Sequence, residues 1–401
     1  MSKSRSAMVM GKGILRLSPT WVPRSFCRPG KRIKLHPDDY YALGLERGGI
    51  DERWFASTTP ADNGPGTPVD EGLSYVVLDQ TGRDKVLLRD VVAELKEEVV
   101  GPRIWQKHAK WPMFAKFFDN VGPLPHHVHH RDEHAALVKQ SGKPEMYFFP
   151  AQLNNHPGEF GYTFFGLNPE TTREQLKQCL LDFSKGDNKI LDLSRCYHLE
   201  LDTGWDVPPG VLHAPGSLCT YEPQFASDVY AMYQSVLYGG HCVPEKLLWK
   251  DSPPEKVGDF DYLVEVLDWA LNVDADFHQN RFMKPIPLDD EKKLLNQGVI
   301  AEWICYRSDE ISAQRITVLP GHTVTIKDTA AHGFILIQGH GRCADWPIET
   351  PVLIRFGECT SDEFFVTYSA AVSGVSYTNL SVNEPLVMLR HFAEKTKTEF
   401  H

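Results

Sequence analysis

The stretch Pro125-His126-His127-Val128-His129-His130 indicates how this part of the chain folds, because its histidines follow the alternation of a β-strand. Residues i and i+2 of a strand point to the same face of a sheet. We therefore expect His127 and His129 to share one face, while Val128 points to the other. The spacing predicts a strand that presents two imidazoles to the interior of a β-domain.

A carboxylate and a third histidine follow further along the chain. In Gly142-Lys143-Pro144-Glu145-Met146 the same alternation places Lys143 and Glu145 together, and Pro208-Pro209-Gly210-Val211-Leu212-His213 ends on a histidine. Three imidazoles and one carboxylate suit zinc, iron, manganese or nickel and leave a coordination position for water or substrate. An open position is typical of catalysis, so the sequence predicts a catalytic divalent metal.

The remaining pattern predicts a mainly β protein. Short strands without intervening helices are typical of antiparallel sandwiches or barrels, and we expect them at residues 114–118, 146–149, 162–165, 196–201, 217–221 and 229–233. Helical periodicity predicts helices at residues 90–100, 172–184 and 261–271. A loop rich in Pro, Gly and Asp is expected at residues 58–71. Because strands return after residue 298, we expect two β-sandwich domains, residues 1–243 and 299–401, joined by a helical connector at residues 244–298.

Composition narrows the function classes. A chain of 401 residues is long enough for two domains, and its formal charge of -11 argues against general nucleic-acid binding, so a small molecule is the expected partner. Eight cysteines are scattered singly, as in the reduced core of a cytoplasmic protein. Neither a signal peptide nor a membrane-spanning run is evident, which makes a cytoplasmic location the expectation. The oligomeric state is left open.

Three segments carry a resemblance to a known family: His127-Val128-His129, Lys143-Pro144-Glu145-Met146 and Pro208-Pro209-Gly210-Val211-Leu212-His213-Ala214. In this order they resemble the Gln-x-His, Lys-x-Glu and Pro-x-Gly-x-x-His-Ala segments of the type I mannose-6-phosphate isomerases, which belong to the cupin superfamily. The resemblance runs from about residue 50 to 392, strongly at the motifs and loosely between them. It implies that both β-sandwich domains are cupin-like jelly rolls.

The resemblance also implies a site and a reaction. A metal, zinc first, with iron, manganese and nickel as alternatives, would be bound by His127, His129, Glu145 and His213, and the protein would convert mannose 6-phosphate to fructose 6-phosphate. Proton removal beside a sugar carbonyl leaves an enediolate, which a divalent cation stabilises as a Lewis acid. Lys143 shares a face with Glu145 and matches the family's lysine. It is therefore our candidate catalytic residue, in the proton relay or in binding substrate oxygens.

The chain departs from the family at two positions. His127 stands where the family has glutamine, and Ala231 stands where it has an arginine thought to be catalytic. Arg131, Arg195 or a residue of the 58–71 loop would have to replace that arginine. Three alternatives therefore stay open: an isomerase of a sugar without phosphate, a cupin metal oxygenase, and a sugar-binding cupin without turnover.

Other side chains compete for roles in the site. Glu133 follows His129 at the usual cupin interval, but residues 131–137 look helical, whereas Glu145 opens an apolar strand. We therefore prefer Glu145 as the ligand. Ordinary roles, in cross-strand pairs, at the surface or beside the ligands, are expected for His126, His130, His134, Glu222 and Asp228. The second β-domain is expected to be structural.

Overall fold

The computed structural model describes residues 1–79, 81–154 and 160–401, whose strands form four sheets. The seven-stranded sheet has the order β15 (Phe282–Met283), β11 (Gly204–Val207), β8 (Glu145–Phe148), β13 (Thr220–Phe225), β6 (Met113–Phe118), β3 (Gly49–Phe55) and β2 (Thr20–Arg24). The N-terminal five-stranded sheet has the order β10 (Ser194–His198), β9 (Tyr162–Leu167), β12 (His213–Ala214), β7 (His127–Val128) and β14 (Ala231–Met232). Three of the predicted metal ligands lie on strands of these two sheets, and the fourth, His129, directly follows β7.

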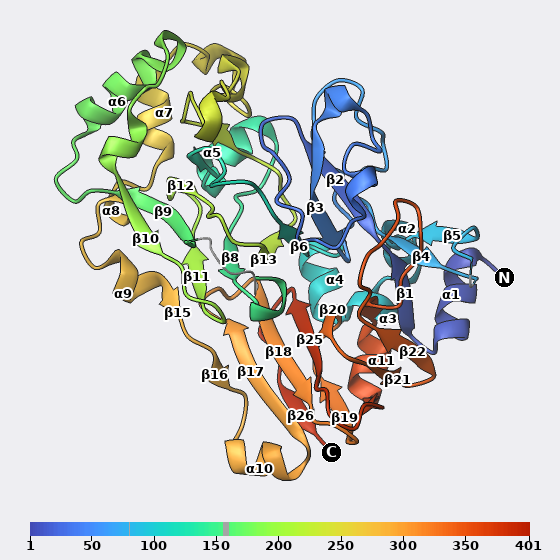
Figure 1. Ribbon diagram of the computed structural model, residues 1–401. Helices are drawn as coiled ribbons and strands as arrows, with labels where there is room; N and C mark the ends of the chain where they lie inside the picture. The colour runs from blue at the N-terminus through green and yellow to red at the C-terminus, as the bar shows by residue number, and fades with distance from the viewer. Residues whose placement is uncertain (80, 155–159) are drawn as a thin grey trace.

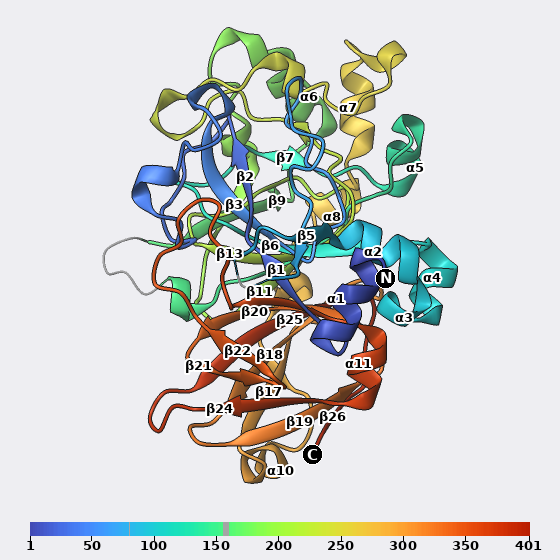
Figure 2. The ribbon, with the colours of Figure 1, turned by 90° about the vertical axis from the view of Figure 1, so that its right-hand side faces the viewer.

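The other two sheets form the lower half of the molecule in Figures 1 and 2. The nine-stranded sheet has the order β16 (Ile286–Pro287), β17 (Val299–Cys305), β18 (Ser312–Val318), β25 (Leu386–Phe392), β20 (His332–Gln338), β23 (Glu363–Val366), β1 (Ile14–Ser18), β4 (Tyr75–Val77) and β5 (Lys85–Leu87). The C-terminal five-stranded sheet has the order β22 (Trp346–Glu349), β21 (His340–Cys343), β24 (Val375–Asn379), β19 (Thr323–Asp328) and β26 (Thr398–Phe400). The expectation of a mainly β protein with cupin-like domains is confirmed.

The seven-stranded sheet is buried on both faces, and alternation along its strands decides which residues face the site. On β6, Ala115 and Phe117 pack into a core shared with Ile335 and Leu389 of the nine-stranded sheet. Phe118 on the same strand packs into a second core, together with residues of the N-terminal five-stranded sheet. Because neighbours along a strand alternate, the even-numbered residues of β6 face the N-terminal five-stranded sheet.

The α-helices lie around the sheets: α1 (Lys3–Gly11), α2 (Leu88–Leu95), α3 (Glu97–Val100), α4 (Pro102–His108), α5 (Asp132–Ala135), α6 (Arg173–Leu181), α7 (Phe260–Val266), α8 (Trp269–Asn272), α9 (Phe277–Arg281), α10 (Glu291–Asn296) and α11 (Tyr368–Ser373). Short 3-10 helices are η1 (Pro37–Asp39), η2 (Leu45–Arg47), η3 (Ala136–Val138), η4 (Ala151–Leu153), η5 (Phe183–Lys185), η6 (Ile190–Leu193), η7 (Tyr238–Gly240), η8 (Glu245–Leu247) and η9 (Pro254–Lys256). None of the described helices reaches the length and apolarity of a membrane span.

The expected helices are present, and two of them are divided. The region 90–100 forms α2 and α3, which are separated at Lys96, where φ is 52°. The region 261–271 forms α7 and α8, because Leu267 is extended and Asp268 caps the second helix. Helix α6 begins after Thr172, whose side chain accepts from the backbone N–H of Gln175 in a capping box. Residues 58–71 contain no helix or strand, as expected.

The N-terminal segment takes part in the lower half of the molecule. Strand β1 pairs with β23 in antiparallel register, so that Ile14 lies opposite Val366. Dark-blue β1 is next to β23 in the nine-stranded sheet, and the lighter blue β4 and β5 follow beyond it (Figure 1). Strand β1 of the N-terminal segment is therefore part of the nine-stranded sheet. The domain boundaries at residues 243 and 298 stay a prediction.

Candidate metal centre

Three histidines meet between the seven-stranded sheet and the N-terminal five-stranded sheet. Strands β7 and β12 are neighbours, and His213 lies directly opposite His127 in their register. His129 follows two residues later on the same side. One ring nitrogen from each of the three lies within 4.8 Å of the others, and each residue is at most 5% exposed. The group can hold a metal ion.

Glu145 reaches this group from β8 on the facing sheet. Its Oε1 lies 3.1 Å from Nε2 of His213, and its Oε2 lies 3.1 Å from Nε2 of His129. The hydroxyl of Tyr147 donates to Glu145 Oε1. The carboxylate is therefore held in place by a neighbour on its own strand, with both oxygens directed at the imidazoles.

The other nitrogen of each imidazole binds the backbone. Nδ1 of His127, His129 and His213 lies 2.7, 2.8 and 2.8 Å from the carbonyl oxygens of Pro125, Val229 and Val211, respectively. A carbonyl only accepts, so each Nδ1 carries the proton and each Nε2 keeps its lone pair. This is the usual arrangement of metal-binding imidazoles. With one carboxylate added, the donor set fits a divalent transition metal.

Burial keeps the imidazoles of His127 and His129 neutral. It lowers the pKa of His127 well below its usual value, helped by the neighbouring His213 and His129, and it lowers the pKa of His129 to about 4, helped by Lys143. Burial opposes ionisation of Glu145, but the charge of Lys143 and the contacts with His129 outweigh it and hold the pKa of this carboxyl well below its usual range. At neutral pH His127, His129 and Glu145 are therefore in the protonation states that bind metal.

Lys143 lies directly against these groups. Its Nζ is 2.9 Å from Glu145 Oε2 and 3.1 Å from His129 Nε2. It also lies 3.5 Å from Oε1 of Glu222 on β13. The predicted catalytic residue is thus in contact with two of the predicted ligands.

A row of charges continues from Lys143 across consecutive strands of the seven-stranded sheet, and we call it the charged ladder. It consists of Lys143, Glu222 on β13, Lys116 on β6, Glu52 on β3 and Arg24 on β2. Successive members are separated by 3.5, 3.3, 3.4 and 3.2 Å between nitrogen and oxygen. Glu222 lies opposite Lys116 in the register, so the cross-strand role expected for Glu222 is present at the site itself.

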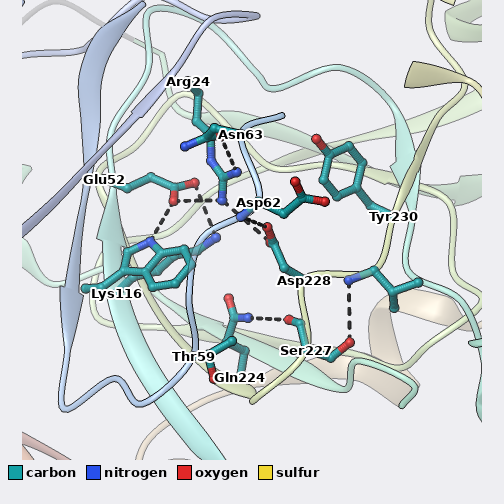
Figure 3. Close-up of polar contacts among 12 residues, drawn as sticks. Arg24, Glu52, Thr59, Asp62, Asn63, Lys116, Gln224, Ser227, Asp228 and Tyr230 are labelled. Carbon is teal, nitrogen blue, oxygen red and sulfur yellow. Dashed lines mark hydrogen bonds and ion pairs between the residues drawn. The ribbon is translucent and has the colours of Figure 1, made fainter. Parts of the chain in front are cut away.

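The Arg24 end of the ladder lies beside Asp62 and Asn63 of the 58–71 loop, as Figure 3 shows. Arg24 donates to Oδ1 of Asn63 at 2.9 Å and lies 3.6 Å from Asp228. The backbone N–H of Asp62 donates to Asp228 at 3.4 Å, and the carboxylate of Asp62 lies 3.2 Å from Lys250. The loop is therefore held to the outer end of the ladder by polar contacts.

The carboxyl of Glu222 differs from the other acids of the ladder. Burial and the negative charge of Glu145 raise its pKa to about 8, against the opposing effects of Lys116 and Lys143. By contrast, the charges of Arg24 and Lys116 outweigh burial at Glu52 and lower its pKa. Glu222 is thus a proton-holding group 3.5 Å from Lys143.

The competing acid and the other histidines lie outside the three-histidine group. Glu133 is on α5, half-exposed, and paired with Arg131 at 2.9 Å, so the helical expectation for this segment is confirmed. His126 is buried against Gln234, with Nδ1 3.3 Å from Oε1. His130 is buried as well, while His134 packs on Tyr262.

The arginines considered from the sequence do not reach the ligands. Arg131 donates to the carbonyl of Glu265, and Arg195 donates to the carbonyls of Asn272 and Asp274. The buried arginine of the site is Arg24, which sequence reasoning missed together with Lys116. A usable signal existed, since Lys116 is the one charge in the apolar run Met113–Phe118, and a buried charge requires a partner.

At the level of sequence, neither a protein-family model nor a curated protein matches the chain. Solved structures match over almost its whole length. A phosphomannose isomerase variant from Salmonella typhimurium aligns with a TM-score of 0.63 at 10% identity, over 96% of this chain and 100% of that chain. The mannose 6-phosphate isomerase from Bacillus subtilis aligns with a TM-score of 0.60 at 14% identity, over 94% and 99%. This chain therefore shares the cupin-like fold of the mannose-phosphate isomerases.

Proposed function

We propose that this protein is a metal-dependent aldose–ketose isomerase, with mannose 6-phosphate and fructose 6-phosphate as the first pair to test. The observation that supports this most strongly is the meeting of His127, His129, His213 and Glu145 with Lys143 in contact. We assign the first four as metal ligands and zinc as the expected metal. When bound, the metal supplies Lewis-acid stabilisation of the negative oxygen that forms beside the sugar carbonyl.

The reaction needs proton carriers from the protein. The proton on C2 of the aldose moves to C1, and the proton of the C2 hydroxyl moves to the oxygen on C1, so no atom is gained or lost. Lys143 and Glu222 are neighbours that can hold and pass a proton, since a carboxyl with a pKa of about 8 gains and loses protons near neutrality. This chemistry is the same whether or not the sugar carries a phosphate at its far end.

The role of Lys143 can be separated into relay and binding by two substitutions. Lys143→Arg keeps the charge but gives up no proton, while Lys143→Gln keeps a hydrogen-bond donor without the charge. A relay role predicts that both variants lose kcat by 100-fold or more, with metal content unchanged. Retention of kcat in Lys143→Arg would instead assign Lys143 to substrate binding.

The activity is tested with zinc-reconstituted protein and mannose 6-phosphate, with free mannose, lyxose and ribose in parallel. Conversion of any of these aldoses to its ketose supports the proposal. Failure with all of them, together with oxygen consumption by iron-loaded protein, would favour the cupin oxygenase. We also propose that the protein acts in the cytoplasm, because its eight cysteines are free thiols, as is usual in a reducing compartment.

A further inference from the structure

One connected set of ion pairs leads from Glu145 to Asp228, and a hydrogen bond from the backbone N–H of Asp62 to Asp228 joins it to the ion pairs of Lys250 nearer the surface. Together these groups contain more acids than bases. Each of the four cations contacts two carboxylates. The cations are Lys143, Lys116, Arg24 and Lys250, and the carboxylates are Glu145, Glu222, Glu52, Asp228, Asp62 and Asp251. Each positive charge beside the candidate metal centre is therefore already paired with acidic groups of the protein.

The exposed fractions of the side chains show which end of this set faces solvent. The side chain of Glu145 is 1% exposed, that of Arg24 is 4%, that of Asp228 is 12% and that of Asp62 is 59%. Figure 3 shows Arg24, Asp228 and Asp62 grouped at the outer end, next to Asn63. We infer that a sugar whose first two carbons lie at the metal points its far end outward along this row, toward Asp228 and Asp62.

A phosphate does not match these surroundings. Proteins bind phosphate with arginine forks or lysines whose donors are directed at its oxygens. Here the guanidinium of Arg24 is shared between Glu52 at 3.2 Å and Asp228 at 3.6 Å. A phosphate dianion placed beside Arg24 would also lie beside those two carboxylates, and like charges repel strongly at partly buried positions.

Sugar hydroxyls, by contrast, match the charged groups of the ladder. A hydroxyl both donates and accepts, so a row in which carboxylates alternate with ammonium and guanidinium groups satisfies it along the whole chain of carbons. Within the described part of the chain, two buried polar atoms beside the ladder have no hydrogen-bond partner: Oε1 of Gln224 and Nε of Arg24. They provide one further acceptor and one further donor.

We propose that the substrate of this site is an uncharged sugar, and that the carboxylates at the outer end of the ladder discriminate against sugar phosphates. This inference rests on the proposed isomerase function for its place of binding. The isomerisation takes place at the first two carbons and does not by itself decide whether the sugar carries a phosphate. The inference decides this point.

The test compares a neutral ligand with its phosphate ester, using the zinc-loaded full chain. Mannitol and mannitol 1-phosphate cannot be isomerised, so calorimetry reports their binding without turnover. We expect mannitol to bind at least tenfold more tightly, and kcat/KM for mannose to exceed that for mannose 6-phosphate by at least tenfold. Equal binding of the two polyols, tighter binding of the phosphate, or no binding of either overturns the inference.

A charge variant tests the cause. Asp228→Asn removes one carboxylate from the outer end, so the preference for mannitol over mannitol 1-phosphate should fall at least threefold. Asp182→Asn is the matched control, because Asp182 pairs with Lys185 beside α6, outside the ladder, and its loss changes the net charge equally. An equal fall in both variants would assign the effect to overall charge and overturn the inference.

The two proposals fail separately. An isomerase that prefers mannose 6-phosphate would overturn the neutral-sugar inference and leave the isomerase function standing. Tight binding of mannitol without conversion of any aldose would support the neutral-sugar inference and overturn the isomerase function.

Discussion

Each of the three histidines at the centre divides its two nitrogens between the backbone and the candidate metal. The carbonyls of Pro125, Val211 and Val229 fix the protonated nitrogen. Two of these carbonyls lie only two residues from the histidine that they bind, so local chain geometry sets the tautomer of His127 and of His213. The orientation of His129 depends on Val229, which is a hundred residues away.

Replacing His129 by Ala should abolish metal binding, because the remaining groups leave one corner of the site empty. We expect about one zinc per chain in the unchanged protein and less than a tenth of that in His129→Ala, measured by elemental analysis after dialysis. His126→Ala is the matched control, since His126 is equally buried three residues earlier but contacts Gln234 instead. Full zinc content in His129→Ala would show the ligand assignment to be wrong.

His391 makes stability depend on pH. Burial lowers its pKa to about 3, whereas an unfolded histidine has a pKa of about 6.5, so the unfolded chain takes up a proton first as the pH falls. Stability is therefore lost between pH 6.5 and pH 3. His391→Gln can keep a hydrogen bond to Tyr221 without titrating. From pH 7 to pH 5 it should lose about 2 kcal/mol less stability than the unchanged protein, measured by urea unfolding. An equal loss in both proteins would contradict this.

At the scale of elements, the close approach of β8 and β11 positions Glu145. Glu145 lies opposite Val207, and Phe148 lies opposite Gly204. A Cβ on Gly204 would lie 2.3 Å from the carbonyl oxygen of Tyr147, so only glycine fits there. The pairing that carries the carboxylate therefore depends on a residue outside every predicted motif.

Gly204→Ala should force β8 and β11 apart, with a loss of stability of about 1–3 kcal/mol. Because Glu145 lies on β8, zinc affinity should fall at least tenfold, measured by competition with a chelating dye. Gly11→Ala is the matched control. Gly11 lies in α1, and a Cβ there would meet only the ring of Trp346, at ordinary contact distances of 3.7 Å or more. Unchanged zinc affinity in Gly204→Ala would show that the metal site does not depend on the pairing of β8 with β11.

Periodicity predicted the elements better than their ends. Alternation and apolar runs located β6, β8 and β9, because burial on a sheet face leaves a direct trace in sequence. The predicted strand at residues 217–221 lies instead at Thr220–Phe225, since pairing with β6 and β8 decides where hydrogen bonding begins. The breaks at Lys96 and Leu267 were missed because they arise from backbone angles that the apolar pattern does not encode.

For the whole molecule, metal binding should contribute to the stability of the fold. The four candidate ligands come from both the seven-stranded sheet and the N-terminal five-stranded sheet, so a bound metal would join the two sheets. Zinc at 100 times its dissociation constant should add about 2.7 kcal/mol, which raises the midpoint of thermal unfolding. Removal of zinc by a chelator should reverse this rise. His129→Ala should show neither change, and an equal response in that variant would indicate binding elsewhere.

The lower half should depend on the N-terminal segment. Residues 299–401 alone lack β1, which pairs with β23, and they also lack the β4 and β5 that follow it in the sheet. We expect this fragment to show no cooperative thermal unfolding, whereas co-expression with residues 1–298 should restore it. A cooperative transition for the fragment alone would support residues 299–401 as an independent folding unit.

The sequence by itself indicated the β-class, and strand alternation together with the order of three motifs made His127, His129, Glu145 and His213 the candidate ligands, because alternation and spacing are local properties. Only the tertiary structure decided which distant charges join them. Arg24, Glu52, Lys116 and Glu222 lie on four different strands and become neighbours because sheet order places β2, β3, β6 and β13 side by side next to β8. Sheet order depends on pairing across the whole chain, and no short stretch of sequence records it.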